Sequence, residues 1–516
     1  MVMQRVSVFG IAAIVFGCGK APTAATKPVV APRSSSELMS NPHEYDIDRI
    51  SANSGKLIFE KTGIGDPYKT GIPYAFFLAM ERAYPEIWGA NWTQRSAKFG
   101  FLDRTPEGSE SDLDTRFGLP VGMHLTTDPL TGVAFLVTNC SLCHAERVPR
   151  SNGATEVVYG LGNKRVRIHA YDTAFADVVA KPRFTASYLG ALATEEAEKH
   201  GLVWPEAYRE VMVGATIDAL KKRAVDRADL IARTRESPPG RVATIESFAV
   251  VLAQLTNQSV TFAKDIGWAK VPDVIGYAHR VTLSWDASGE GPIDLLVVEA
   301  DIAAGARVEW LETHPFQGAS LGAYLRAPAP RPAFPGSIDT ALAQKGKQLF
   351  EDTCEHCHGT YADDGHVEQY TEQIVPLADV HTDPARVLAP TESFERAAND
   401  PSLTRGYTRF RRSEGYVPPV LTNVWARAPY GHAGQWPSLA YLATPPDQRA
   451  KQFVVDLGAP YNLTTIGVAT LPANVPVPAS GYAHDATRPG FGVGGHPFLA
   501  DLGADARAVI EYLKTL

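Results

Sequence analysis

Apolar stretches in the first half of the chain predict three buried elements. Residues 75–80 form a short, wholly apolar run, which predicts a buried helix or strand. A second apolar run, 133–137, leads directly into a segment that contains cysteines. After Pro205, apolar residues recur at helical spacing as far as Ala219, which predicts a long helix with Pro205 as its first residue.

The last third of the chain begins and ends on predicted amphipathic helices. The first follows Ser337, a suitable N-cap, and places apolar residues on one face as far as Phe350. The second closes the chain, and its apolar positions are Ala506, Val509, Ile510, Leu513 and Leu516. Loop-rich sequence with paired prolines lies between the two helices. We therefore expect a mainly α protein with long loops and few short strands.

A proline-rich segment at 327–337 marks the clearest domain boundary. Its prolines favour extended, semi-rigid polyproline II geometry, so the parts that it joins are expected to keep a fixed relative orientation. The boundary separates a first domain at 45–326 from a second domain at 338–516. Within the first domain, the aromatic and β-branched segment 268–286 is interpreted as core; the alternative is that it lines the open side of a site at the first cysteine-containing segment, 140–144.

The N-terminal residues predict export. An early Arg5, an apolar run at 6–16 and a small residue before Cys18 are typical of a secretory signal whose end resembles a bacterial lipobox. We predict a lipoprotein signal peptide at 1–18, with an ordinary signal peptide as the alternative. Residues 19–44 are rich in Pro, Ala, Thr and Ser, which predicts a flexible tether. The expected location is the periplasmic side or the cell surface, with a lipid anchor in a bacterial membrane.

Composition narrows the class of protein. The chain has 45% hydrophobic and 21% charged residues, which is typical of globular proteins. Its net charge of -8 gives no basic footprint, so no nucleic-acid partner is expected. Four of the five cysteines fall in two C-x-x-C clusters, which leaves Cys18 as the fifth.

Those clusters are two C-x-x-C-H motifs, the first motif at 140–144 and the second motif at 354–358. In this motif two thiols attach a haem covalently and the adjacent imidazole becomes the proximal ligand of its iron. Two covalently bound haem c groups are therefore expected. The predicted attachment residues are Cys140, Cys143, Cys354 and Cys357, and the predicted proximal ligands are His144 and His358.

Half of a zinc site and a redox-active dithiol are the alternatives for such a cysteine pair. A zinc site would need further Cys or His ligands, and a dithiol has no use for a His directly after its second Cys. Because that His occurs in both motifs, haem attachment is favoured. Residues 338–516, with a helix at each end, have the arrangement of a cytochrome c domain, and two cytochrome c-like haem domains are expected.

Further short motifs give the chain a resemblance to a known family. They are residues 118–122, 239–241, 345–350, 382–384, 419–425, 428–432 and 511–516. With the two haem motifs, they resemble the bacterial dihaem cytochrome c peroxidase superfamily, and within it the rubber-oxygenase branch more than the peroxidases. The resemblance covers most of residues 70–516.

The resemblance implies a division of labour between two haems. The haem with His144 as proximal ligand would be the reactive one and would bind peroxide or dioxygen, with an organic substrate and redox partner proteins as further partners. The second haem would be six-coordinate and would transfer electrons. Val274 and Ile275 align with an aromatic pair of the rubber oxygenase, which disfavours polyisoprene as substrate. No acidic distal residue of the peroxidase kind is recognised, so the distal residues are left unassigned.

The sixth ligand of the second haem follows mainly from an absence. All six methionines precede position 213, so the second domain offers none. Histidine is left, and the candidates besides His358 are His356, His366, His381, His432, His484 and His496. In the rubber-oxygenase branch the second ligand precedes the final helix, which implies His496. His432 is the alternative, and Tyr430 ranks third by analogy with a tyrosine-ligated relative.

Three functions are compatible with these motifs. The favoured one is an exported dihaem oxidoreductase that activates peroxide or dioxygen at the first haem and receives electrons through the second. The others are an electron-transfer protein without substrate turnover and a haem-based redox sensor. The favoured hypothesis accounts for the large first domain, which a simple electron carrier does not need.

Overall fold

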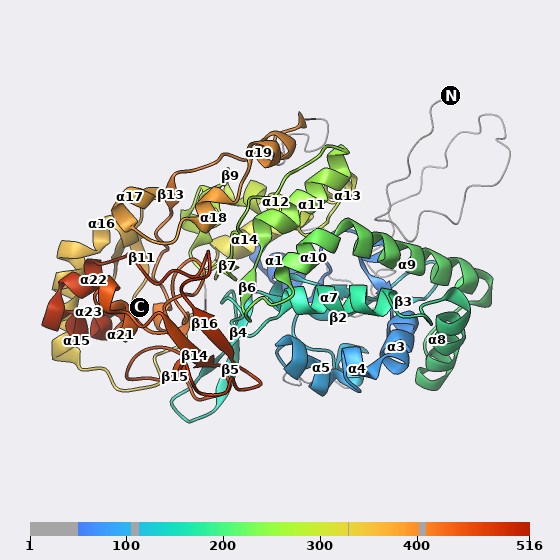
Figure 1. The fold of residues 1–516 in the computed structure, drawn as a ribbon, viewed down its shortest axis with the longest axis horizontal. Coiled ribbons are helices and arrows are strands. Elements are labelled where there is room, and N and C mark those ends of the chain that lie inside the picture. Colours follow the sequence, from blue (N-terminus) through green and yellow to red (C-terminus); the bar gives the residue numbers. More distant parts are fainter. Residues whose placement is uncertain (1–49, 105–112, 329, 402–408) are drawn as a thin grey trace.

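The computed structural model describes residues 50–104, 113–328, 330–401 and 409–516. The predicted signal peptide and tether, together with Cys18, lie outside the described residues. The fold is mainly helical with small antiparallel sheets, as the sequence predicts. We call the part of the chain before the proline-rich linker the first half and the part after it the second half. In Figure 1 most of the first half lies toward the right, and the C-terminal part, in orange and red, lies on the left. The expected division into two cytochrome c-like domains stays a prediction.

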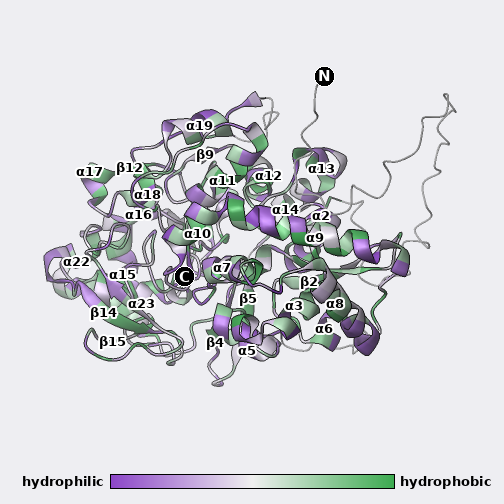
Figure 2. Ribbon diagram, turned by 45° about the vertical axis from the view of Figure 1, so that its right-hand side comes forward, coloured by the Kyte–Doolittle hydropathy of each residue, from purple (hydrophilic) through white to green (hydrophobic). Residues whose placement is uncertain are grey.

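The apolar run 75–80 forms a helix rather than a strand, and the long predicted helix is present. Pro205 is the N-cap of that helix instead of its first residue, so the prediction was one position early. Figure 2 shows hydrophilic and hydrophobic residues alternating along it, since only one of its faces is buried. The helices before the linker are α1 (Ala52–Lys61), α2 (Pro67–Thr70), α3 (Tyr74–Ala83), α4 (Pro85–Trp88), α5 (Trp92–Phe99), α6 (Leu113–Phe117), α7 (Ile168–Val179), α8 (Ala186–His200), α9 (Glu206–Asp226), α10 (Ala228–Thr234), α11 (Thr244–Thr256), α12 (Ile293–Ala303), α13 (Val308–Thr313) and α14 (Pro315–Arg326).

The apolar run 133–137 forms the central strand of a small sheet ordered β1-β3-β2. Both β1 and β2 pair with β3 in antiparallel register, with Ile72 opposite Leu136 and Met123 opposite Thr138. The other sheets of this half are hairpins or short pairs: β4 with β5, β6 with β7, and β8 with β9. The strands are β1 (Ile72–Pro73), β2 (Met123–Thr127), β3 (Ala134–Thr138), β4 (Ala145–Pro149), β5 (Thr155–Tyr159), β6 (Arg241–Val242), β7 (Ala269–Lys270), β8 (Thr282–Leu283) and β9 (Gly289–Glu290).

The second half is built on its first and last helices. The N-cap of the first one is Asp339, whose side chain accepts a hydrogen bond from the backbone of Leu342; the prediction of Ser337 was wrong, because the helix begins at residue 340. The helices are α15 (Thr340–Thr353), α16 (Glu355–His358), α17 (Leu377–Val380), α18 (Ala385–Leu388), α19 (Glu392–Ala398), α21 (Leu439–Leu442), α22 (Phe498–Asp501) and α23 (Ala506–Leu513). The strands are β10 (Thr360–Tyr361), β11 (Val367–Gln369), β12 (Val375–Pro376), β13 (Gly415–Tyr416), β14 (Gln452–Asp456), β15 (Ala469–Pro472) and β16 (Tyr482–Asp485).

Helices α15 and α23 cross in close contact. A Cβ at Gly346 would lie 1.9 Å from the carbonyl oxygen of Ala508, so only glycine allows this approach. The apolar positions predicted for the closing helix are buried, from Ala506 to Leu516. The crossing holds the C-terminal end of α15, where the second motif begins, against the core.

Buried polar contacts join the two halves. The guanidinium of Arg241 donates to the carbonyl of Ala433 over 2.7 Å and to the hydroxyl of Tyr482 over 2.7 Å. Arg386 and Asp286 form a buried ion pair at 3.1 Å. The halves are thus joined by specific buried contacts.

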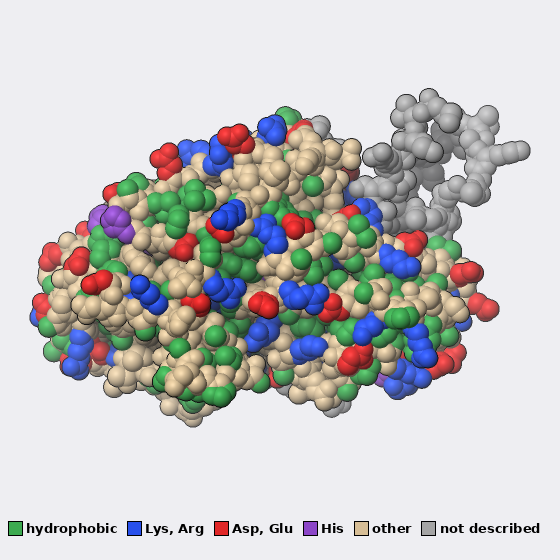
Figure 3. Space-filling model, viewed as in Figure 1, with side chains coloured by type: hydrophobic (Ala, Val, Ile, Leu, Met, Phe, Trp, Pro, Cys, Tyr) green, Lys and Arg blue, Asp and Glu red, His purple; other side chains and the backbone are tan. Residues whose placement is uncertain are grey.

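On the face seen in Figure 3, basic and acidic side chains are interspersed rather than gathered by sign.

Candidate haem sites

The second motif lies at the end of α15. Cys354 is the C-cap of that helix, and the short helix α16 continues from it through Cys357 to His358. The backbone of His358 donates to the carbonyl of Cys354 over 3.0 Å, which closes one helical turn and brings both cysteines beside the imidazole. Neither thiol is in a disulfide. Two free thiols and one imidazole thus lie close together on one helical turn.

The ring of His358 is held by a backbone carbonyl. Its Nδ1 lies 2.8 Å from the carbonyl oxygen of Pro419, so Nδ1 carries the proton and Nε2 keeps its lone pair. Burial lowers the pKa of His358, while this hydrogen bond raises it by less. Metal-binding histidines usually donate their second N–H to a carbonyl or carboxylate in this way. His358 therefore has the tautomer of an iron ligand.

His496 lies opposite His358. The two ring centroids are 6.2 Å apart. Two imidazoles on opposite sides of one metal atom have centroids about 6 Å apart, because each metal–nitrogen bond is about 2 Å and each ring centre lies about 1 Å behind its nitrogen. Burial, followed by the neighbouring His358, lowers the pKa of His496 to about 3, so its ring is neutral. The spacing and the protonation states fit a pair of axial ligands.

Backbone geometry explains how His496 reaches this position. His496 adopts a φ of 47°, in the left-handed region, and its N–H donates to the carbonyl of Val380 over 2.8 Å. A Cβ at the preceding Gly495 would lie 2.5 Å from the backbone nitrogen of Thr382. The glycine therefore lets the chain run close to residues 380–382 before His496 turns inward.

Two other ligand candidates, His432 and Tyr430, have partners of their own. The ring of His432 stacks on Tyr416, with centroids 4.3 Å apart, and its Nε2 lies 3.3 Å from the hydroxyl of Tyr416. Nδ1 of His432 lies 3.5 Å from the side-chain amide of Gln435. The hydroxyl of Tyr430 donates to the carbonyl of Val424 over 3.1 Å. The geometry thus supports His496 over His432 and Tyr430.

Two adjoining cavities border both His358 and His496, and together they form the His358 pocket. Their shared lining is Trp285, Cys354, His358, Pro419, Gly431, Trp436 and His496. One of the two, which we call the Lys270 cavity, is also lined by leucines, valines and Phe350, together with the charged side chains of Lys270, Asp273 and Arg427. The other, which we call the His432 cavity, is also lined by His432 and by mainly apolar residues, with no Lys, Arg, Asp or Glu. A largely apolar slot beside two thiols and two facing imidazoles fits a covalently bound haem.

The first motif follows β3. Asn139 caps a short helical turn, η2 (Cys140–Leu142), by accepting a hydrogen bond from Ser141, and its amide donates to the carbonyl of Glu60 over 2.8 Å. Gly122 has a φ of 86°, and a Cβ there would lie 2.1 Å from the backbone nitrogen of Leu142. The glycine before the motif is therefore needed for this close approach.

His144 has the same kind of support as His358. Its Nδ1 lies 2.9 Å from the carbonyl oxygen of Pro272, and burial lowers its pKa. Among the described residues, however, no imidazole is recorded in ring contact with His144. Cys140 and Val274 pack against a small apolar cluster that includes Phe59 and Leu321. The resemblance placed both Val274 and Ile275 near the first haem. Val274 does pack against the same cluster as Cys140, while Ile275 packs in a core made mainly of second-half residues.

Sequence reasoning missed several buried charged groups near the motifs. Burial, followed by the nearby Asp301 on α12, raises the pKa of the Cys140 thiol, and burial raises the pKa of Asp301 itself to about 7. Lys270, Asp273 and Arg427 line the His358 pocket. The segment interpreted as core also differs in part, because Trp268 is core but Trp285 lines the His358 pocket. No short motif marks such residues, since their burial arises only in the fold.

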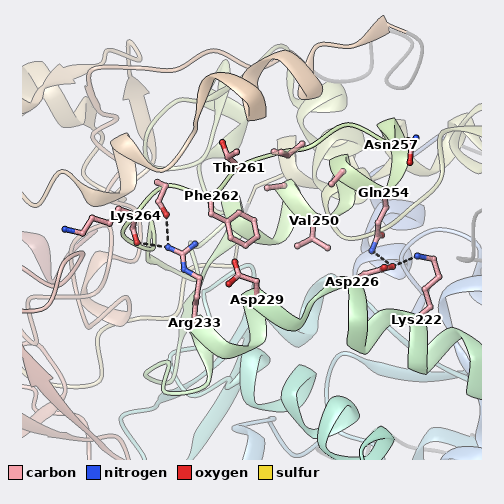
Figure 4. A pocket seen from close by; sticks show the side chains of 14 residues that line it. Lys222, Asp226, Asp229, Arg233, Val250, Gln254, Asn257, Thr261, Phe262 and Lys264 are labelled. Carbon is pink, nitrogen blue, oxygen red and sulfur yellow. Dashed lines mark hydrogen bonds and ion pairs between the residues drawn. The ribbon is translucent and has the colours of Figure 1, made fainter.

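An open cavity of about 860 Å³ lies away from both motifs, between α9, α10 and α11. Figure 4 shows Asp226 bonded to Lys222 and Gln254, and Arg233 bonded to the backbone. Asp226 lies 2.6 Å from Lys222 and 2.9 Å from Gln254, and Arg233 donates to the carbonyl of Lys264 over 2.7 Å. Lys222 and Asp226 of α9 thus lie in one wall of an open groove.

Two observations bear on other classes of protein. In the described ranges, no group of three or more His, Cys, Asp or Glu side chains is placed to hold one metal ion, whereas a structural zinc site needs four such ligands. No helix within those same ranges has both the length and the apolar character to cross a membrane.

Comparisons with known proteins bear on the second site. A family model described as RoxA-like, cytochrome c-like matches residues 415–454, which include Pro419 and His432. The uncharacterized protein y4iM of Sinorhizobium fredii is 30% identical over 152 residues, 24% of this chain and 33% of that protein. The uncharacterized protein y4iJ of the same organism is 26% identical over 242 residues, 35% of this chain and 40% of that protein. The chain thus spans well under half the length of these relatives.

The match at 415–454 links the chain to RoxA-like cytochromes c and implies covalently bound haem c. The matched segment runs from β13 into β14, and residues within it, such as Tyr416, Pro419 and His432, line one side of the His358 pocket.

Proposed function

We propose that this chain is an exported c-type cytochrome with two covalently attached haems, an oxidoreductase of the dihaem peroxidase and rubber-oxygenase kind. Cys140 and Cys143 would attach the first haem, and Cys354 and Cys357 the second. A haem with an open coordination position supplies the capacity to bind and activate peroxide or dioxygen. A haem with two protein ligands is confined to electron transfer.

One observation carries this proposal: the two proximal histidines have different surroundings. His358 faces a second imidazole at 6.2 Å, whereas His144 has no facing imidazole among the described residues. His358 and His496 would therefore both be available to hold the second haem, while His144 would hold the first. The asymmetry supports a reactive first site and an electron-transferring second site.

The residues around each proximal histidine have a clear positioning role. The carbonyls of Pro272 and Pro419 fix the Nδ1-protonated tautomer of His144 and His358. Burial favours the neutral imidazole at both positions, which leaves Nε2 available as a ligand. At the first motif, Cys140 packs against an apolar cluster built on Ile58, Phe59 and Leu321. These features support tight and oriented binding rather than a particular substrate.

Spectroscopy of the purified ferric and ferrous protein tests the proposal. We expect one low-spin haem that binds no added ligand and one haem that is high-spin or becomes so on partial reduction, and that binds carbon monoxide or cyanide. Two low-spin haems that bind neither ligand in any redox state would instead support the electron-transfer protein or the redox sensor.

Export and anchoring are part of the same proposal, since c-type haem is attached outside the bacterial cytoplasm. Expressed with a c-type maturation system, the protein should fractionate with membranes through a lipid on Cys18. Cys18→Ser should release it or block its processing; unchanged membrane association of that variant would contradict the anchor but not the haem sites.

A further inference from the structure

The charged residues of the His358 pocket are concentrated in one cavity. Lys270, Asp273 and Arg427 line the Lys270 cavity, and the adjoining His432 cavity has no Lys, Arg, Asp or Glu in its lining. All three side chains are less than 9% exposed. Lys270 and Asp273 belong to the first half of the chain, so the second site is completed by residues from outside 338–516.

Arg427 is oriented by contacts on one edge of its guanidinium. Nη1 donates to the carbonyl of Val420 over 2.6 Å and pairs with Asp273 at 3.2 Å, and Nη2 donates to the carbonyl of Thr422. Its Nε is buried and has no hydrogen-bond partner among the described residues. A buried donor of a charged group without a partner is costly, so a ligand atom is expected to meet it.

Lys270 is also incompletely paired. Its Nζ donates to the carbonyl of Arg427 over 2.5 Å, which is its one recorded hydrogen bond in the described part of the chain, although an ammonium group has three donors. Burial lowers the pKa of Lys270 to about 7, although Asp273 raises it. With Lys270 protonated, the cavity holds two cations and one carboxylate, so one positive charge lacks a counterion. An anionic group in the cavity would supply it.

We propose that Lys270 and Arg427 bind a propionate carboxylate of the second haem, and that the first half of the chain thereby sets the charge around the electron-transferring site. The inference rests on the proposed function, because it requires a haem between His358 and His496. The haem bears carboxylates at one edge only. The carboxylate edge would lie in the Lys270 cavity, while the apolar remainder would occupy the rest of the pocket.

The test uses the full-length holoprotein and the variants Lys270→Gln, which removes the charge, and Lys270→Arg, which keeps it. Lys164→Gln is the matched control, because Lys164 is also a buried lysine beside a carboxylate, 3.5 Å from Glu146, but does not line the pocket. Three quantities are measured: haem per chain by pyridine haemochrome, the propionate bending band by resonance Raman, and the reduction potential of the low-spin haem by EPR-monitored titration.

Lys270→Gln should keep two haems per chain, shift the propionate band and lower the reduction potential of the low-spin haem. In the wild type the positive charge of Lys270 stabilises the reduced iron. Its removal should therefore raise the ratio of oxidised to reduced haem at a fixed potential about tenfold, equivalent to a fall of about 59 mV in the reduction potential. Lys270→Arg should restore most of the potential, and Lys164→Gln should leave it unchanged.

The outcomes separate this inference from the proposed function. A wild-type protein without haem at the second motif would overturn both. If that haem is present and low-spin but Lys270→Gln moves neither the propionate band nor the potential, the carboxylate assignment alone is wrong. An equal fall in Lys164→Gln would show a general effect of buried charge and would likewise contradict the assignment.

Discussion

The two C-x-x-C-H motifs differ little in what lies behind the proximal histidine and much in what lies in front of it. Both His144 and His358 hold their Nδ1 against a proline carbonyl, at 2.9 Å and 2.8 Å. The ring of His358 lies 6.2 Å from that of His496, whereas at the first motif Cys140 packs against an apolar cluster. The comparison teaches that a motif fixes attachment and the proximal ligand, and that the opposite face decides what the haem can do.

The strongest way to break the comparison is to remove one haem at a time. Cys354→Ala or Cys357→Ala should leave one covalent haem per chain, and the remaining haem should bind carbon monoxide. Cys140→Ala or Cys143→Ala should also leave one haem, but it should be low-spin and bind no ligand. Haem staining and pyridine haemochrome measure the stoichiometry; a variant that keeps two covalent haems would contradict attachment at that cysteine.

The next test makes the second site resemble the first. His496→Ala removes the facing imidazole, so the low-spin EPR signal should be replaced by that of a high-spin or water-ligated haem. His432→Ala is the control, because His432 stacks on Tyr416 and should leave the low-spin signal in place. Survival of that signal in His496→Ala, with its loss in His432→Ala, would reverse the assignment of the ligand.

How much of these sites the sequence predicts depends on the range of the contacts. The motifs and the closing helix are local patterns, and they were predicted with their residues. The supporting carbonyls were not predicted, because Pro272 lies 128 residues from His144 and Pro419 lies 61 residues from His358. His496 was singled out through the missing methionines and a family resemblance, and the fold then places it opposite His358.

Buried charges were missed for a different reason. In the sequence, Lys270, Asp273 and Arg427 look like ordinary solvated residues, and only the packing of the two halves encloses them. Asp339 was missed as an N-cap in favour of Ser337, since both residue types cap helices and the pattern of apolar residues does not fix the first turn.

A smaller effect concerns the backbone before the first motif. Gly122 and Gly118 both adopt left-handed φ values, 86° and 63°, but a Cβ at Gly122 would meet Leu142 at 2.1 Å, whereas a Cβ at Gly118 has nothing within 4 Å. Gly122→Ala should lower the free energy of unfolding by about 3 kcal/mol or more, and Gly118→Ala by about 1–2 kcal/mol. Denaturant unfolding of the holoprotein measures both; equal losses would show that the contact with Leu142 carries no weight.

The last prediction concerns a dependence of stability on pH that comes from the first site. Burial raises the pKa of Asp301 from 3.8 to about 7. Below about pH 4 the carboxyl is protonated in both the folded and the unfolded chain, and between about pH 4 and 7 only the unfolded chain loses the proton. Unfolding then releases a proton, so this group lowers the free energy of unfolding as pH rises, by at most about 1.4 kcal/mol per pH unit, and its contribution levels off above pH 7.

Asp301→Asn should remove that contribution, because the amide does not titrate. Unfolding midpoints measured at several pH values between 4 and 8 should therefore fall less steeply in the variant than in the wild type, and the variant should be the more stable one at pH 8. Glu156→Gln is a control, since Glu156 is partly exposed and paired with Arg150 on the β5 hairpin. Parallel curves for Asp301→Asn and the wild type would show that the carboxyl is already ionised in the folded protein at low pH, which would place a counter-charge or water beside Asp301 and make the first site more polar than its apolar lining indicates.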